Sequence, residues 1–309
     1  MVNVENLVKR YGDLLALDHL KLEIKEGEIF GLLGPNGSGK TTAISCILAL
    51  LKYDKGDISI FGENMTSNNY GVKRRIGIVP QNVAVIDELT VYENIDYFCG
   101  LYITDKKKRK KLVEEAVEFA GLEKYVKMRP KQLSGGLLRR LNIACGIAHK
   151  PKLIIMDEPT VAVDPQSRNK ILDGIVKLNQ NGATVIYTSH YMEEVEQICT
   201  RIAIIDGGKC IAEGTVEELK KMIKTGETIT VENIFLDDGQ ISDIKSIKQV
   251  FDVDYKDNVL VIRCSSGKNN LVKILNYLQD KNVSFGRVFS ELPTLNDVFL
   301  EITGKQLRD

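Results

Sequence analysis

Hydrophobic and polar residues alternate near the start of the chain, which predicts a strand with one buried face. The apolar positions of this strand are Leu20, Leu22 and Ile24. A turn at Glu26-Gly27 separates it from the segment 28–33, which predicts a strand that ends in a glycine-rich loop. The spacing then changes to that of a helix beginning at Thr41. The apolar face of this helix holds Ile44, Ile47, Leu48 and Leu51.

Three later apolar runs are typical of strands that are buried on both faces. They lie at 75–79, 152–156 and 183–188. Because segments with helical spacing separate the strands, the alternation predicts a largely parallel sheet that is covered on both sides. Two further runs, 202–205 and 210–212, are joined by Gly207-Gly208 and predict a hairpin that closes this α/β core.

Residues of about 85–150 differ from the rest of the core. They have helical spacing and few β-branched runs, so we expect an all-helical insert. One apolar face of this insert consists of Leu112, Val113, Ala116, Val117 and Ala120. The basic run at 106–111 lies just before that face. We interpret it as a solvated, frayed helix start, and attraction to lipid or nucleic acid is the alternative.

The character of the chain changes again after a predicted helix at 216–223 and Gly226. The segments that follow predict a small α+β domain. They are strands at 228–231, 250–255, 259–263 and 283–289, and helices at 271–278 and 295–302. We therefore expect a core domain at 1–225 and an accessory domain at 226–309.

The composition is that of an ordinary globular protein, with 43% hydrophobic and 27% charged residues. Lysine plus arginine equals aspartate plus glutamate, so the basic excess of a general nucleic-acid binder is missing. The six cysteines form no Cys-x-x-Cys pair and there are only three histidines, so we expect reduced thiols rather than a metal site. No apolar stretch approaches the roughly 20 residues of a bilayer helix, and the N-terminus lacks the shape of a signal peptide. We therefore expect a cytoplasmic protein.

A glycine-rich segment joins the strand at 28–33 to the next helix and fits the phosphate-binding loop pattern. Its residues are Gly34, Pro35, Asn36, Gly37, Ser38, Gly39, Lys40 and Thr41, and Thr42 follows. The glycines let backbone N–H groups turn towards phosphate oxygens, and the helix N-terminus adds positive potential. Lys40 would neutralise the β- and γ-phosphates of ATP, and Thr41 would hold Mg²⁺. A glycine-rich turn with an unrelated lysine is the alternative, but the strand–loop–helix setting favours nucleotide binding.

The buried strand at 152–156 leads into two adjacent acidic residues, Asp157 and Glu158. In a P-loop NTPase, Asp157 suits the Mg²⁺ shell. Glu158 could polarise the attacking water as a general base. A strand that ends in acids is common by itself, but the phosphate loop elsewhere in the chain favours the catalytic interpretation.

A second anion-binding site is indicated by Ser134, Gly135 and Gly136, which precede a helix expected to begin near Leu137. They offer a hydroxyl and two unblocked backbone N–H groups at a helix N-terminus. One chain does not need two phosphate cradles for one ATP, so this segment would complete the nucleotide site of another subunit. A helix cap with flexible glycines is the alternative.

The segment Leu133-Ser134-Gly135-Gly136 resembles the signature motif of ABC ATPases. Further motifs follow in the order and spacing of that family, over about residues 1–220. The resemblance implies an α/β fold: a P-loop NTPase core with an antiparallel β subdomain and an α-helical insert. The signature position Leu137 and the positions Val161 and Ala162 depart from the family's usual residues. Neither departure removes a phosphate ligand or the catalytic acid, so active ATP hydrolysis is expected.

The same resemblance implies roles for four other residues. Tyr11 lies where the family stacks an aromatic ring on adenine, although an ordinary tyrosine at a strand end is the alternative. Gln81 matches the Q-loop glutamine, which contacts Mg²⁺ or water and links the core to the helical insert. Asp164 matches the D-loop that crosses the dimer. His190 matches the H-loop histidine that contacts the γ-phosphate.

The segment 291–301 resembles the tail of ATPases that serve drug, antibiotic and polyketide exporters of the daunorubicin-export (ABC-2) type. This likeness implies a homodimer, or a heterodimer with a related ATPase, that closes on ATP and drives an integral membrane permease. Contact with the permease would involve Gln81 and the residues 82–90, and would hold the chain at the inner face of the cell membrane. The family's permease, not its ATPase, contacts the cargo. A soluble ABC ATPase of translation or DNA maintenance is the competing class. The chain holds one cassette and shows neither sustained coiled-coil heptads nor zinc-binding cysteine clusters, which argues against that class.

Overall fold

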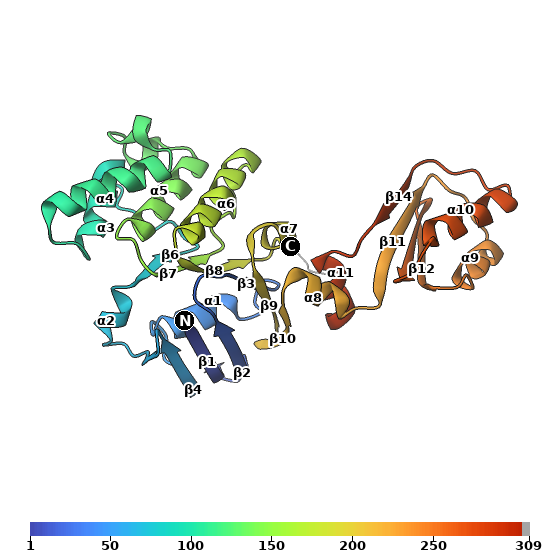
Figure 1. Ribbon diagram of the computed structural model, residues 1–309, viewed down its shortest axis with the longest axis horizontal. Helices are drawn as coiled ribbons and strands as arrows, with labels where there is room; N and C mark the ends of the chain where they lie inside the picture. Colours follow the sequence, from blue (N-terminus) through green and yellow to red (C-terminus); the bar gives the residue numbers. More distant parts are fainter. Residues whose placement is uncertain (305–309) are drawn as a thin grey trace. The chain divides into compact units, whose positions relative to one another are not determined.

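The computed structural model describes residues 1–304; residues 305–309, the end of the expected accessory domain, lie outside the described part. The chain divides into two compact units, Met1–Thr215 and a second that begins at Val216 (Figure 1). The division precedes residue 225 because the helix α8 (Val216–Lys221) packs against α11 (Leu295–Thr303) of the second unit. The limits 1–225 and 226–309 stay a prediction for the functional domains. None of the helices in residues 1–304 combines the length and hydrophobicity needed to cross a membrane.

A six-stranded sheet forms the centre of the first unit, in the order β10-β9-β3-β8-β7-β6. Its strands are β3 (Ile29–Leu33), β6 (Ile76–Val79), β7 (Leu153–Asp157), β8 (Thr184–Ser189), β9 (Arg201–Asp206) and β10 (Lys209–Gly214). The first five run parallel, and β9 and β10 form the predicted antiparallel hairpin. Leu32 on β3 packs in the core around the helix α1 (Lys40–Ile47), whereas a Cβ on the neighbouring Gly31 would touch Val195 and Cys199, on the side of the helix α7 (Met192–Ile198). Since successive strand residues point to opposite faces, helices cover both sides of the sheet, as predicted.

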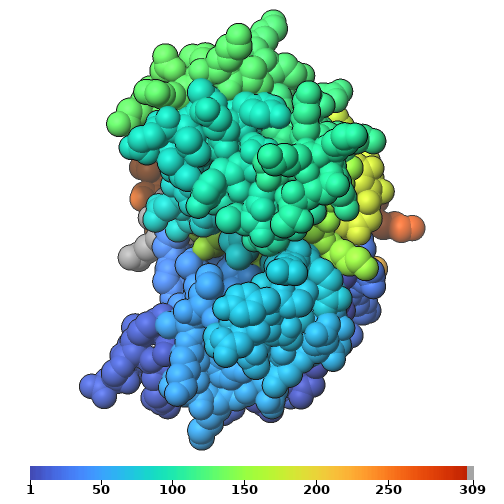
Figure 2. Space-filling model, turned by 90° about the vertical axis from the view of Figure 1, so that its left-hand side faces the viewer, coloured from blue at the N-terminus to red at the C-terminus, as the bar shows by residue number. Residues whose placement is uncertain are grey.

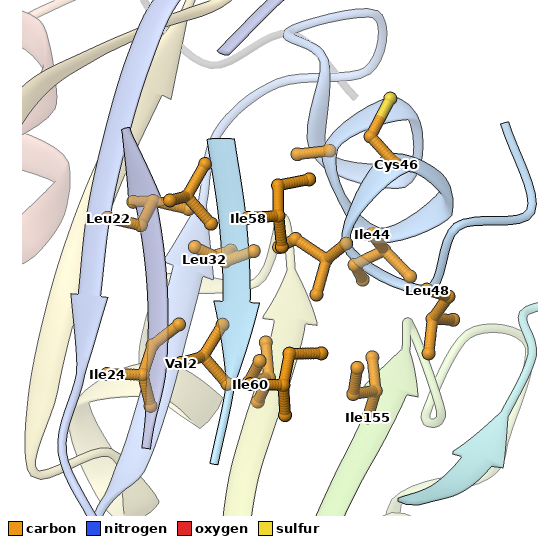
Figure 3. Packing of buried hydrophobic residues seen from close by; sticks show 14 of the residues in the cluster. Val2, Leu22, Ile24, Leu32, Ile44, Cys46, Leu48, Ile58, Ile60 and Ile155 are labelled. Atoms are coloured by element: carbon orange, nitrogen blue, oxygen red, sulfur yellow. The ribbon is translucent and has the colours of Figure 1, made fainter. Parts of the chain in front are cut away.

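A second, antiparallel sheet has the order β2-β1-β4-β5. Its strands are β1 (Val2–Tyr11), β2 (Leu14–Ile24), β4 (Lys55–Ile60) and β5 (Glu63–Asn64). The predicted buried face of β2 is confirmed at Leu20, Leu22 and Ile24. The helix α1 (Lys40–Ile47) packs against both sheets, so that side chains such as Ile44, Leu32 and Ile58 meet in one core (Figure 3).

The helical insert is confirmed between β6 and β7. It contains α3 (Val91–Gly100), α4 (Lys106–Phe119), two short 3₁₀ turns η1 (Glu123–Tyr125) and η2 (Pro130–Gln132), and α5 (Gly135–Ile147). The predicted apolar face of α4 is buried in its own cluster. The start of α4 is not frayed, because Asp105 caps it by accepting a hydrogen bond from the Lys108 backbone. In Figure 2 the insert (green) and the lobe that carries α2 (Tyr70–Lys73, light blue) form the two halves of the visible face.

Two further helices of the first unit, α6 (Pro165–Gln180) and α7 (Met192–Ile198), were not specified from the sequence. The second unit is an α+β structure whose four-stranded antiparallel sheet has the order β12-β13-β11-β14. Its elements are β11 (Thr225–Glu232), α9 (Asp238–Lys245), β12 (Val250–Lys256), β13 (Val259–Ser265), α10 (Asn270–Asp280) and β14 (Val288–Glu291), besides α8 and α11. Residues of β11, β12 and β13 share one buried core with α9 and α10.

Several predicted boundaries are wrong. The strand expected at 283–289 begins only at Val288, because the Val283 backbone N–H bonds the carbonyl of Leu278 at the end of α10 instead of a neighbouring strand. The helix expected at 216–223 ends at Lys221, and Gly226 lies inside β11. The helix expected near Leu137 begins two residues earlier, because the Ser134 hydroxyl caps it and both glycines are helical. The helix α1 likewise begins before Thr41 and ends before Leu51.

Candidate functional site

The phosphate-binding loop runs from the buried end of β3 to the start of α1. Gly37 and Gly39 adopt left-handed backbone angles, with φ of 80° and 108°. A Cβ on Gly34 would lie 2.2 Å from the carbonyl oxygen of Ile205, so only glycine fits there. The Ser38 hydroxyl is buried without a hydrogen-bond partner in the described chain. A buried orphan hydroxyl in a glycine-rich loop at a helix N-terminus is a group that a phosphate ligand would satisfy.

Lys40, the first residue of α1, is only 5% exposed. Its Nζ donates hydrogen bonds to the carbonyl oxygens of Gly34 (2.7 Å) and Pro35 (3.1 Å), which holds the ammonium over the loop. Burial lowers the pKa of Lys40, and the nearby Glu158 and Asp157 carboxylates oppose that shift. Thr41 beside it is exposed and Thr42 is partly buried, while Asn36 and Gly37 at the loop tip are exposed.

The end of β7 places Asp157 and Glu158 in the interior, with exposed fractions of 6% and 5%. The Thr188 hydroxyl on the adjacent strand donates a 2.6 Å hydrogen bond to Asp157 and accepts one from the Glu158 backbone N–H at 2.9 Å. Glu158 has a positive φ of 46°, a conformation that costs a non-glycine residue about 1–2 kcal/mol.

Side chains from three other segments meet at the Glu158 carboxylate. The Gln81 Nε2 donates to its Oε2 at 3.1 Å. The Lys40 Nζ lies 3.6 Å from its Oε1. The His190 Nδ1, just beyond β8, lies 3.3 Å from the same oxygen, although the angle is not that of a hydrogen bond. The fold therefore brings together four of the residues that the sequence had marked for catalysis.

A buried carboxylate that the sequence analysis missed lies beside this cluster. Glu194 on α7 is 3% exposed, and its Oε2 accepts hydrogen bonds from Tyr187 (2.6 Å), Thr160 (2.7 Å) and Ser189 (3.2 Å). The Arg168 Nε lies 3.2 Å from its other oxygen. This network joins the loop after Glu158 to the strand end before His190. In the sequence, Glu194 follows another glutamate, Glu193, and no local signal distinguishes the two.

The Ser134–Gly136 segment forms the first turn of α5, where the Ser134 hydroxyl accepts a 3.4 Å hydrogen bond from the Leu137 N–H. Apart from its chain neighbours and the backbone of α5 itself, no described atom lies within 4 Å of a Cβ built on Gly135, so this position faces open space. A Cβ on Gly136 would instead touch Ser167 and Asp164. Asp164 caps α6 by accepting a 2.9 Å hydrogen bond from the Ser167 N–H, which lowers the pKa of Asp164.

Tyr11 ends β1, just before Gly12, which has a positive φ of 59°. Its side chain is 49% exposed, and the Lys9 ammonium lies 5.2 Å from the ring centroid. An exposed ring with a cation on one face has a surface free to stack on a flat ligand. The place of Tyr11 in the nucleotide site stays a prediction.

The donor atoms fit Mg²⁺ and a nucleoside triphosphate. Asp157, Thr41 and Gln81 offer hard oxygen ligands, the kind that Mg²⁺ prefers. The loop amides, the orphan Ser38 hydroxyl and the Lys40 ammonium suit phosphate oxygens.

Comparison with known protein families gives two matches. Residues 17–161 match the family model "ABC transporter". Residues 214–303 match the family model "ATP-binding protein DrrA1-3-like, C-terminal domain". The two matches together cover the phosphate loop, the insert, the acidic strand end and most of the second unit.

Curated relatives align over the whole chain. The Linearmycin resistance ATP-binding protein LnrL of Bacillus subtilis is 39% identical over 311 residues, covering 100% of both chains. The Daunorubicin resistance ATP-binding protein DrrA3 of Streptomyces coeruleorubidus is 33% identical, covering 99% of this chain and 97% of its own. The Nod factor export ATP-binding protein I of Sinorhizobium fredii is 32% identical, and the match covers 100% of this chain and 87% of that protein.

Among solved structures, a dimeric post-hydrolysis state of the ATP-binding cassette MJ0796 bound to ADP and Pi superposes with a TM-score of 0.64. The two sequences are 30% identical, and the match covers 70% of this chain and 98% of the cassette. A second dimeric structure of MJ0796, a bacterial ABC transporter cassette, superposes with the same TM-score of 0.64. Both the sequence and the fold are therefore those of an ATP-binding cassette.

Proposed function

This chain belongs to the ATP-binding subunits of ABC transporters, in the DrrA-like subfamily, and on that basis we propose how its residues turn ATP hydrolysis into export. The protein is an ATPase whose hydrolysis serves transport. The observation that carries the proposal is the convergence of Lys40, Gln81 and His190 on the buried Glu158 carboxylate.

Each of these residues has a chemical task in hydrolysis. The loop amides and Lys40 bind the β- and γ-phosphates, and Glu158 accepts a proton from the attacking water. His190 donates towards the γ-phosphate, and Gln81 orients water through its amide. Thr41, Asp157 and Gln81 would hold Mg²⁺, which when bound neutralises charge on the phosphates. Tyr11 stacks on the adenine ring.

A second subunit completes the site. Gly135 faces open space and Ser134 is exposed, so the start of α5 is free to cap a nucleotide bound by another chain. Two structures of one similar cassette, MJ0796, are dimeric. The partner is a second copy of this chain or a related ATPase, and Asp164 lies next to the same contact. ATP closes the dimer because the nucleotide itself supplies interface contacts, and hydrolysis removes them.

The energy of closure passes to an integral membrane permease through Gln81 and residues 82–90. This contact holds the chain at the inner face of the cell membrane. The relatives include resistance proteins for linearmycin and daunorubicin and an exporter of Nod factors. We accordingly assign export, with a cargo from the class of drugs, antibiotics, peptides or lipids.

The Glu158→Gln variant tests the hydrolytic assignment. It keeps the shape of the side chain and removes the base, so kcat should fall at least about 100-fold. ATP binding survives, and the variant should form a stable ATP-dependent dimer in light scattering. Glu193→Gln is the matched control, because Glu193 is exposed on α7; its turnover and oligomeric state should equal those of the wild type.

Wild-type turnover in Glu158→Gln, or a monomer at saturating ATP, contradicts the proposal. Capture of the chain from membranes checks the partner: a co-purified polytopic permease supports transport. Co-purified ribosomes or DNA would instead support the soluble ABC class. Susceptibility of a Glu158→Gln strain to a panel of antibiotics then reports the cargo.

A further inference from the structure

Two buried polar side chains of α5 hold the loop that carries Gln81. Arg139 is 7% exposed, and its Nη1 donates to the carbonyl oxygen of Gln81 at 2.6 Å and to that of Pro80 at 3.4 Å. Asn142, three residues further on, donates to the Pro80 carbonyl at 3.2 Å and accepts from the Ala84 N–H at 3.0 Å. Residues three apart lie on the same face of a helix, so both side chains form hydrogen bonds to one loop.

The guanidinium of Arg139 also reaches towards a second functional loop. Its Nη2 lies 3.5 Å from the carbonyl oxygen of Val161, which precedes Asp164. Arg139 is therefore bonded to main-chain oxygens on two loops, a task that suits the wide, planar fork of five guanidinium donors better than the compact ammonium of lysine. These contacts join α5 to the loop that carries Gln81 and to the loop that follows Glu158.

Arg139 lies on the helix that Ser134 begins. A helix is a stiff rod, so displacement of its first turn displaces the whole element. The carbonyl held by Arg139 belongs to Gln81, whose side chain donates to the Glu158 carboxylate at 3.1 Å. One residue thus connects the surface offered to the partner's nucleotide with the hydrolytic site of its own chain.

We propose that Arg139 is a positioning residue that couples engagement of Ser134 with the partner's ATP to the placement of Gln81 in the chain's own site. The inference rests on the proposed dimer and on the proposed role of Gln81. When Ser134 binds the nucleotide held by the partner, α5 moves, and Arg139 carries Pro80 and Gln81 with it. The two sites of the dimer then hydrolyse ATP in concert.

Arg140 provides a matched control. It is the next residue on the same helix, and its Nη1 donates to the carbonyl oxygens of Ala120 (2.8 Å) and Gly121 (3.3 Å), both within the insert. Methionine at either position removes the donors and keeps a long side chain. Arg139→Lys keeps the charge but contacts fewer carbonyls, so it should restore part of the function that Arg139→Met loses.

The test measures ATP turnover of the full-length chain against ATP concentration. Arg139→Met should lower kcat about 10–100-fold, as expected for a misplaced catalytic group, and bring the Hill coefficient to 1. KM should change less than about twofold, because the phosphate loop is intact. Arg140→Met should keep the wild-type kcat and Hill coefficient. Circular dichroism confirms that each variant is folded.

A double-mutant cycle separates coupling from a merely structural effect. If Ser134→Ala and Arg139→Met each cost about 30-fold, independent effects would multiply to about 1,000-fold in the double variant. Coupling through one path predicts a loss close to that of one variant alone. Additive effects, or an Arg139→Met variant that behaves like Arg140→Met, overturn the inference. An unchanged Ser134→Ala variant would instead refute the dimer proposal itself.

Discussion

Gly135 and Gly136 are adjacent residues that should respond to alanine in opposite ways. A Cβ on Gly136 would lie 2.4 Å from the Ser167 Oγ and 2.8 Å from the Ser167 Cβ, so the first turns of α5 and α6 would have to separate. A Cβ on Gly135 would meet no described atom of any other segment within 4 Å. Only Gly136 is therefore required for packing within the chain.

The free energy of unfolding should show this difference. Overpacking at Gly136 lowers the free energy of unfolding by about 1–3 kcal/mol, whereas replacing a helical glycine with alanine raises it by up to about 1 kcal/mol. Gly136→Ala should therefore lose about 1–2 kcal/mol. Gly135→Ala has only the favourable contribution, so it should be as stable as the wild type or more stable by up to about 1 kcal/mol. The two variants should differ by about 2 kcal/mol.

ATP turnover, unlike stability, should fall in Gly135→Ala. Its added methyl group enters the space that the partner's nucleotide would occupy, so Gly135→Ala should lose ATP turnover about tenfold while the fold is unharmed. Urea unfolding followed by circular dichroism measures stability, and phosphate release measures turnover. Ser167→Gly should restore part of the stability of Gly136→Ala. Equal stability losses in the two variants, or full activity of Gly135→Ala, would refute this reasoning.

Three other expectations can be checked. Burial against the stacked Tyr102 ring lowers the pKa of His149 from 6.5 to about 4. As the pH falls, His149 is therefore protonated in the unfolded chain before it is protonated in the folded chain. The free energy of unfolding should fall by about 3 kcal/mol between pH 6.5 and pH 4. Urea titrations should show that His149→Phe abolishes this loss. Glu194→Gln should reduce the free energy of unfolding by about 1–3 kcal/mol and also lower kcat, whereas exposed Glu193→Gln should change stability by less than about 0.5 kcal/mol. Chelation of Mg²⁺ should abolish turnover, and Asp157→Asn should raise the Mg²⁺ concentration for half-maximal activity about tenfold, as phosphate-release assays can show.

The sequence alone determined the elements whose signals are local. Short stretches of sequence predict three features: the glycine-rich loop between a strand and a helix, the acids at the end of a buried strand, and the hydrophobic face of α4. Their physical basis is the steric freedom of glycine and the periodicity of side chains along strands and helices. Boundaries failed where capping decided them, as at Gly135, whose helix begins at the Ser134 cap rather than at the first apolar residue.

Only the tertiary structure decided which side chains meet. Gln81 and Glu158 are 77 positions apart in the chain, and their hydrogen bond exists because β6 and β7 are paired in parallel, so that their ends lie at the same edge of the sheet. Glu194 and Arg139 have ordinary sequence neighbourhoods, and their importance comes from burial among donors or acceptors of distant segments. A local window holds no information about such partners, since the free energy of a buried polar group depends on what the fold places around it.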